Sequence, residues 1–282
     1  MATATSHTVT PEIYGKSGDI SKHLDGVKKQ YDTAEKRDFY AQVMGDGKFR
    51  QSRRRFGGTI AYLMSNFFFI LTGTANIHFG KWDGIDLDAE GAYGKASDAM
   101  TDFMLKHALE LLGNPEKVTY VDLGSGSGGA AVRNLTLCDK IAKVSCVNLC
   151  DEQNAAALKS ATDSKVNERF EVVTTTYDET PFPDNSFDFA FSQDAYVHSF
   201  SKTKSYAEAL RVVKPGGVFI FCDLMAGTGE GVTEEQYQTF AQTNMVNDFL
   251  NPANNVKACE EAGWTEVKYI DLTPDIKTSF QL

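Results

Sequence analysis

Val121-Asp122-Leu123-Gly124-Ser125-Gly126-Ser127-Gly128-Gly129 is the stretch of this chain that decides its fold. A buried strand predicted over 118–123 runs here into a glycine-rich turn, and a helix is expected from about residue 129. Glycine lets the backbone turn tightly and come closer to a ligand than any side chain would allow. The first turn of the helix would present unpaired N–H groups and its positive dipole end to that ligand. The stretch therefore predicts a nucleotide-like cofactor at the carboxyl end of this strand.

Strand and helix patterns alternate from residue 118 onward. Strands are predicted over 118–123, 143–149, 170–175, 187–192, 217–222 and 265–270, and helices over 129–137, 152–160, 202–213, 234–247 and 253–262. This alternation predicts an α/β fold, a Rossmann-like, doubly wound and mostly parallel sheet with helices on both faces. Helical patterns also cover 20–44 and 97–112. We expect a flexible arm over 1–19, an N-terminal helical lid over 20–112 and the α/β domain over 113–282.

The bulk composition narrows the partners and the compartment. The 282 residues carry a formal net charge of −10, which argues against a nucleic-acid partner. Five cysteines lie without the spacing of a metal site or a disulfide framework, and are expected to be reduced, buried thiols. No secretory signal is visible at the N-terminus, and we expect a cytoplasmic protein with no bound metal. The composition leaves the oligomeric state open.

The residues around the glycine turn favour S-adenosylmethionine over a dinucleotide. Gly124, Gly126 and Gly129 fit the dinucleotide pattern, which is weak evidence alone. The second predicted strand ends in Asn148 instead of the acidic residue that holds a dinucleotide ribose. Asp122 would face a cation better than a pyrophosphate, and S-adenosylmethionine carries a sulfonium and an ammonium. The alternative for Asp122 is a carboxylate at a strand end that only caps the turn.

A second polar stretch, Ser192 to Ser199, follows the fourth predicted strand. Asp194 and His198 are four residues apart, so on a helical turn they would share one face. They would lie at the carboxyl end of the strand, where this fold places its chemistry. A histidine with a carboxylate neighbour is a proton acceptor near neutral pH. The alternative is an aspartate that caps a helix, with a histidine partner one turn later.

The chain resembles the class I S-adenosylmethionine-dependent methyltransferases. The Val121–Gly129 turn carries this resemblance together with the Lys214-Pro215-Gly216-Gly217 turn before the fifth strand. Within that class it resembles the sarcosine/dimethylglycine N-methyltransferases and, more distantly, the phosphoethanolamine N-methyltransferases. The similarity covers about 25–48 and 76–275. Its further motifs are Gln30-Tyr31, Phe39-Tyr40 with Gly45, Ile77-His78-Phe79-Gly80, Asn148-Leu149 with Gln153, and Ser192-Gln193-Asp194-Ala195 with His198.

The resemblance implies a role for each matching residue. The catalytic set is Tyr31 and His198, which would close over the acceptor, with Asp194 or Tyr31 orienting the histidine. The methionine end of the cofactor would be held by Gln30, Ile77, His78, Gly124 and Gln193. Its ribose and adenine would be held by Asn148, Leu149, Thr176 and Tyr177. The turn and the second strand add Asp122, Ser125, Gly126 and Gln153 to the predicted cofactor site.

These residues predict S-adenosylmethionine-dependent N-methylation of a small amine such as glycine, sarcosine or dimethylglycine, as in betaine-type osmolyte synthesis. Gln193 stands where the phosphoethanolamine enzymes usually have arginine, which favours an amino-acid acceptor. One alternative is S-methylation of a small thioether acid, which needs no base. The other is a catalytically impaired fragment of the family that keeps the fold without turnover. A dehydrogenase is disfavoured by Asn148 and Asp122.

Two segments depart from the family. An atypical apolar insertion covers about 48–75, in which the uncharged stretch Phe56–Ala75 follows the basic run Arg50–Arg55. It would be a membrane segment, a soluble insertion or an intron read as coding sequence. The resembling enzymes continue beyond a sixth strand into a helix and an antiparallel seventh strand. We expect that seventh strand to be missing here, with the sixth strand as an exposed edge.

Overall fold

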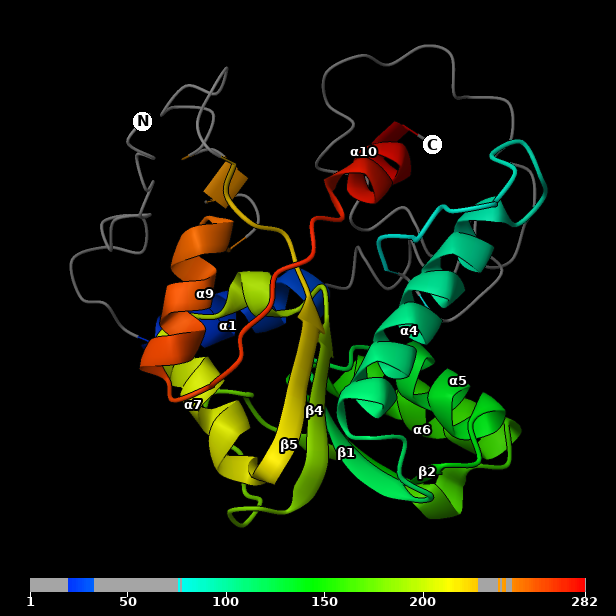
Figure 1. Cartoon of the computed structure of the whole chain (residues 1–282), viewed down its shortest axis with the longest axis horizontal. Coiled ribbons are helices and arrows are strands. Elements are labelled where there is room, and N and C mark those ends of the chain that lie inside the picture. Colours follow the sequence, from blue (N-terminus) through cyan, green and yellow to red (C-terminus); the bar gives the residue numbers. More distant parts are fainter. Residues whose placement is uncertain are drawn as a thin grey trace.

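A five-stranded parallel sheet forms the centre of the protein (Figure 1). The computed structural model describes residues 20–32, 76, 78–227, 238, 240–241 and 245–281. The strands lie in the order β3-β2-β1-β4-β5. Their bounds are β1 (Val118–Leu123), β2 (Ile141–Asn148), β3 (Phe170–Thr174), β4 (Phe187–Gln193) and β5 (Val213–Cys222). The strand order reverses between β1 and β4, and this is where ligands bind in open α/β sheets.

Helices cover both faces of the sheet (Figure 1). One face is covered by α4 (Ala92–Leu111), α5 (Gly129–Leu137) and α6 (Asp151–Asp163), and the other by α7 (Lys202–Val212) and α9 (Pro252–Glu261). Each face buries its own apolar core, because successive residues of a strand point to opposite sides. In β1, Tyr120 packs into the first core and Val121 and Leu123 into the second. The predicted doubly wound, Rossmann-like α/β fold is confirmed.

The predicted boundaries agree closely with the first four strands, while β5 begins four residues earlier than expected. Val213 pairs with Phe187, and the register then shifts so that Val218 pairs with Phe189. The Lys214–Gly217 turn is accommodated in that shift as a bulge at the start of β5.

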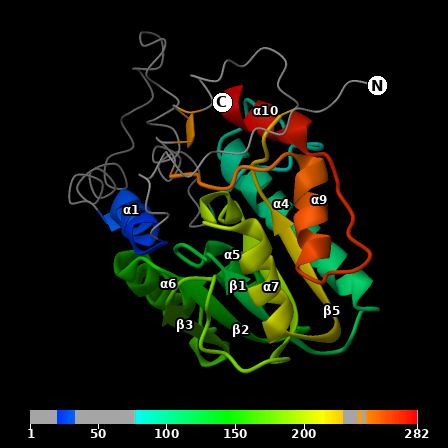
Figure 2. The same cartoon turned by 90° about the vertical axis from the view of Figure 1, so that its left-hand side faces the viewer.

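The predicted sixth strand over 265–270 is wrong. Residues 264–272 form no strand and lead from α9 to the C-terminal helix α10 (Thr273–Gln281) (Figure 2). Glu266 has a φ of 55°, a left-handed conformation that interrupts an extended chain. Val267 packs on the core, whereas Tyr269 and Ile270 are 45% and 52% exposed. In the described residues, β5 therefore forms this edge of the sheet.

The helices predicted outside the sheet region agree with the structure only in part. The helix α1 (Ile20–Asp32) matches the start of the pattern over 20–44, and α4 begins five residues before the predicted 97. The predicted helix over 234–247 is too long, because Met245 has a left-handed φ of 52°. The arm over 1–19 and the insertion over 48–75, with its three alternatives, lie outside the described residues. Where the chain is described, no helix combines the length and apolar character needed to cross a membrane.

The C-terminal helix α10 lies against the segment that leads out of His78. The Oγ of Ser279 accepts hydrogen bonds from the backbone N–H of Gly80 at 3.1 Å and from Nε1 of Trp82 at 2.8 Å. Asp275 accepts from the backbone N–H of Trp82 at 2.7 Å and from Lys81 at 3.1 Å. Ser279 is fully buried in this contact. An element that the sequence did not predict therefore anchors residues 80–82, which follow the predicted site residue His78.

Candidate active site

Several of the predicted site residues lie at one edge of the sheet, at the carboxyl ends of four strands. Gly124 follows β1, Asn148 ends β2, Thr176 lies just beyond β3, and Gln193 ends β4. This edge includes the switch point between β1 and β4. Residues that are up to 69 positions apart in the sequence are thus neighbours here because parallel strands end together.

The glycine turn is fastened to β2 and closely packed against the residue after Asp194. The backbone N–H groups of Gly124 and Ser125 both donate to the carbonyl of Val147, at 2.8 and 3.1 Å. Gly124 has a φ of 87°, and a Cβ there would lie 2.3 Å from the Cβ of Ala195. Glycine is therefore required by both conformation and space. Around Gly126 a Cβ would meet nothing within 4 Å, so the open side of the turn lies there.

Asp122 places a buried carboxyl group just before this turn. Asp122 is only 3% exposed, and burial raises the pKa of its carboxyl group to about 7. Burial is the cause of the shift, and no cation among the described residues lowers the pKa. A carboxylate in such surroundings gains from a positively charged ligand, which restores the ionised form.

Gln193 offers a buried hydrogen-bond donor at the end of β4. It is 3% exposed, and its Oε1 accepts from the hydroxyl of Thr101 at 2.9 Å. Asn76 donates to the same Thr101 oxygen at 2.9 Å, which fixes it on α4. The Nε2 of Gln193 has no hydrogen-bond partner among the described residues. An unsatisfied buried amide is costly, so this group is suited to donate to a ligand.

Asn148 is held in one orientation by its neighbours on α6. Its Nδ2 donates to Oε1 of Gln153 at 3.1 Å and to Oδ1 of Asn154 at 3.0 Å. Asn154 is buried and donates in turn to Thr174 at 2.9 Å. Because the side-chain amide donors are used within the protein, the side-chain Oδ1 of Asn148 is the atom suited to accept from a ribose hydroxyl. Leu149 follows directly and is half-buried.

The loop after β3 packs its predicted residues against the glycine turn. The hydroxyl of Thr176 donates to the carboxylate of Asp178 at 3.0 Å and accepts from its backbone N–H at 3.1 Å. The hydroxyl of Tyr177 donates to the carbonyl of Ala195 at 3.1 Å, and its ring stacks on Tyr196 with centroids 4.7 Å apart. This loop therefore links the ends of β3 and β4 beside the turn.

Asp194 does not share a helical face with His198, so that expectation is wrong. Asp194 has a left-handed φ of 54° and precedes the short helix η5 (Tyr196–His198). Its Oδ2 accepts from the backbone N–H of Phe79 at 2.9 Å and lies 3.3 Å from Nδ1 of His78. A left-handed residue cannot continue into a helical turn with its usual side-chain spacing. The carboxylate instead joins the end of β4 to residues 78–79.

The segment at His78 is also tied to α4. The backbone N–H of His78 donates to the hydroxyl of Ser97 at 2.8 Å, and that hydroxyl donates back to the carbonyl of His78 at 2.5 Å. Ser97 and Thr101 lie one turn apart on α4, and Asn76 donates to Thr101 from outside the helix. Sequence reasoning missed these residues, because serine, threonine and asparagine at helical spacing carry no distinctive signal.

The turn that carries His198 is in contact with α1. The Nε2 of His23 lies 2.7 Å from the carbonyl of His198, so it must carry the proton and donate. Burial lowers the pKa of His23, which favours this neutral form. Tyr31 lies about two helical turns further along α1. The side chains of Gln30 and Tyr31, and all of Ile77, lie outside the described residues, so their roles stay predictions.

A family model described as a methyltransferase domain matches residues 121–221, from the glycine turn to β5. The chain therefore contains a methyltransferase domain over this range. S-adenosylmethionine is the cofactor of this family, and the site suits it. Asp122 is a buried carboxyl group, the Gln193 amide has no acceptor in the part of the chain that the structure describes, and the turn is open at Gly126. No metal-ligand cluster of His, Cys, Asp or Glu occurs in the described residues.

Several relatives of this chain have names that include the acceptor. The sarcosine/dimethylglycine N-methyltransferase of Halorhodospira halochloris is 33% identical over 162 residues, 57% of this chain and 54% of that protein. An enzyme of the same name from Aphanothece halophytica is 28% identical over 215 residues, 72% and 73% of the two chains. A Galdieria sulphuraria protein assigned as a sarcosine dimethylglycine methyltransferase superposes with a TM-score of 0.67 at 25% identity, covering 76% and 79%. The chain matches about half the length of the first two curated relatives.

Proposed function

We propose that this methyltransferase transfers the methyl group of S-adenosylmethionine to the nitrogen of a small amine, with glycine, sarcosine and dimethylglycine as the first candidates. The observation that carries the proposal is the position of His198. It lies on the turn that follows Gln193, at the sheet edge that also holds Asp122. The names of the relatives support an amine acceptor.

The cofactor would be held by three chemically different groups. The carboxylate of Asp122 would attract its cationic end, and the Nε2 of Gln193 would donate to its methionine carboxylate. The side-chain Oδ1 of Asn148 would accept from its ribose. When bound, S-adenosylmethionine supplies an electrophilic methyl group on a sulfonium.

The acceptor must lose a proton before it can react. Small amines are protonated near neutral pH, and only the free lone pair of the nitrogen can form the new N–C bond. In our proposal the imidazole of His198 takes that proton. The nitrogen then forms the N–C bond as the S–C bond breaks, and the electron pair of that bond stays on sulfur. Alignment of the two reactants supplies most of the rate enhancement.

The remaining catalytic predictions take different roles. Asp194 is a positioning residue, since its carboxylate holds residues 78–79 against the end of β4. Tyr31 stays a predicted contact of the acceptor, on a helix that reaches the His198 turn through His23.

Methyl transfer to separate acceptors tests this proposal. The full chain is incubated with methyl-labelled S-adenosylmethionine and, in parallel, with glycine, sarcosine, dimethylglycine, phosphoethanolamine or a small thioether acid. We expect label on the nitrogen of at least one of the three amino acids. Label on the thioether alone would replace the proposal with S-methylation. Cofactor binding without transfer to any acceptor would favour a catalytically impaired protein.

A further inference from the structure

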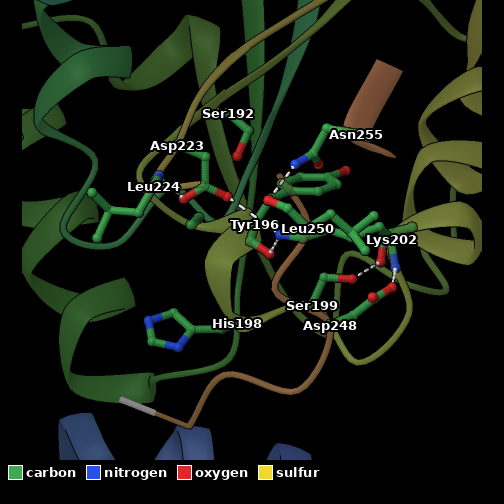
Figure 3. A network of polar contacts seen from close by, with 12 residues as sticks. Ser192, Tyr196, His198, Ser199, Lys202, Asp223, Leu224, Asp248, Leu250 and Asn255 are labelled. Atoms are coloured by element: carbon green, nitrogen blue, oxygen red, sulfur yellow. Dashed lines mark hydrogen bonds and ion pairs between the residues drawn. The ribbon is translucent and has the colours of Figure 1, made fainter. Parts of the chain in front are cut away.

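A buried lysine lies beneath the turn that carries His198. Lys202 begins α7 and is 1% exposed. Its Nζ donates to the carbonyl of Tyr196 and lies 3.5 Å from Oδ2 of Asp223, the residue that follows β5. Figure 3 shows this network with the ring of His198 set apart from it. The lysine thus connects the end of β5 to the first residue of η5.

The carboxyl groups around Lys202 compensate only in part for the effect of burial on its pKa. Burial lowers the pKa of Lys202, while Asp223, Asp248 and Asp178 raise it. Burial raises the pKa of Asp223, and Lys202 lowers it in turn. Buried ion pairs are often no more stabilising than well-packed apolar residues of similar volume. Fold stability is therefore a weak explanation for a lysine at this position.

The contacts of Lys202 converge on a single turn. The carbonyl of Tyr196 accepts from Lys202 and also from the backbone N–H of Ser199 at 2.8 Å. The backbone N–H of Lys202 donates to Asp248 at 2.7 Å, which fixes the start of α7. Asn247 donates to the carbonyl of Phe200 at 2.6 Å. Residues 196–202 are thus held at both ends by hydrogen bonds to their backbone atoms.

We propose that Lys202 is a positioning residue for methyl transfer: together with Asp223, it fixes the turn that presents His198 to the acceptor. The inference rests on the proposed function, because it gives His198 the role of the base. Lys202 itself does not reach the reactants, since its ammonium is occupied by the Tyr196 carbonyl and Asp223. Asp223 acts through Lys202 and completes its neutralisation.

A paired substitution separates positioning from stability. Lys202→Met removes the cation and leaves Asp223 buried without it, so we expect a lower Tm. Lys202→Met/Asp223→Asn removes both charges and is expected to recover most of that Tm. It still lacks the donor to Tyr196, so we expect kcat to remain reduced by about 100-fold with little change in cofactor affinity. The control is Lys204→Met, an exposed lysine on the same helix, which should match the wild type.

A spectroscopic readout makes the test independent of turnover. The imidazole NMR signal of His198 is assigned by its loss in His198→Ala, and that of His107 on α4 serves as an internal reference. We expect the His198 signal to move in the double variant while the His107 signal stays unchanged. Lys202→Arg, which keeps a charged donor, should hold the His198 signal near its wild-type position and keep kcat within about tenfold. If the Lys202→Met/Asp223→Asn variant does not fold, Lys202→Arg takes its place in the test.

Wild-type kcat together with an unmoved His198 signal in the double variant would overturn the inference and leave the pair a structural one. If the wild type methylates no amine, the proposed function fails. The His198 signal then still decides whether Lys202 positions the turn, so the two failures are distinguishable.

Discussion

Asp122 illustrates how a single buried residue can prepare a site for a cation. Its carboxyl group is held at the end of β1, where burial alone raises its pKa to about 7. Near neutral pH it is therefore partly protonated in the absence of a ligand. A cation beside it selects the ionised form, and the proton must leave on binding. We therefore expect cofactor binding to be coupled to the ionisation of Asp122.

Affinity for S-adenosylmethionine should therefore fall as the pH is lowered below about 7. The decrease is expected to approach about tenfold per pH unit, because one proton is released on binding. Asp122→Asn should bind more weakly and lose most of this pH dependence. Calorimetric titrations in two buffers of different ionisation enthalpy count the released protons directly. A wild-type affinity that is constant across this range, with no proton release, would contradict the coupling.

At the scale of elements, α10 is hydrogen-bonded to residues 80–82, which follow the predicted site residue His78. The hydroxyl of Ser279 satisfies two donors from this segment, the Gly80 N–H and the Trp82 indole. The same segment continues to Phe79, whose N–H is bonded to Asp194. A contact at the C-terminal helix is thus connected to the end of β4 through a few consecutive residues.

Ser279→Ala should weaken cofactor binding several-fold. It leaves two donors without their acceptor, at a cost of about 1–3 kcal/mol for each buried group. Thr278→Ala is the matched control, since among the described residues the Thr278 hydroxyl bonds to the carbonyl of Pro274 within α10. Titration of both variants with S-adenosylmethionine checks the expectation. Equal affinities for the two variants would mean that α10 does not position the site.

The sequence was sufficient where a local pattern meets a general rule of the fold. Apolar runs ended by glycine or polar residues identified β1 to β4, and hence the edge at which Asn148 and Gln193 lie. The same kind of pattern failed at 265–270, because a strand also needs a partner and an apolar surface to cover. The spacing of Asp194 and His198 was also misleading. Asp194 itself has a left-handed backbone conformation, so the two residues do not belong to one helix.

Several residues that support the predicted site were beyond prediction. Thr101 supports Gln193 from 92 residues away, and Ser97 holds His78 from the middle of α4. Asn154 orients Asn148 from within α6. Each has an unremarkable residue type at an ordinary helical position. Only the packing of α4 and α6 on the sheet gives these residues their roles.

For the whole molecule, the buried carboxyl group at the site has a cost in stability. In the unfolded chain Asp122 loses its proton near its ordinary pKa, whereas the folded chain retains it up to about pH 7. The folded state therefore binds more protons between these values, and the contribution of Asp122 to stability falls as the pH rises through this window.

Asp122→Asn should accordingly be more stable than the wild type at about pH 8. The expected difference is on the order of 3 kcal/mol, and it should shrink toward about pH 5, where the wild-type side chain is neutral. Urea unfolding of both proteins at several pH values measures it. Parallel pH profiles for the two proteins would show that burial does not perturb Asp122 as described. A gain in stability together with a loss of cofactor affinity in Asp122→Asn would identify Asp122 as a group that is retained for binding.

The effect of His198→Ala on turnover and on cofactor binding tests the proposed chemistry most directly. The substitution removes the imidazole and leaves the backbone carbonyl that His23 contacts. We expect turnover of the amine acceptor to fall by about 100-fold to 10,000-fold, the range for loss of a general base. The dissociation constant of S-adenosylmethionine should change by no more than about twofold, and His107→Ala should resemble the wild type. Loss of cofactor binding with unchanged turnover per bound complex would contradict the assignment of His198 as the base.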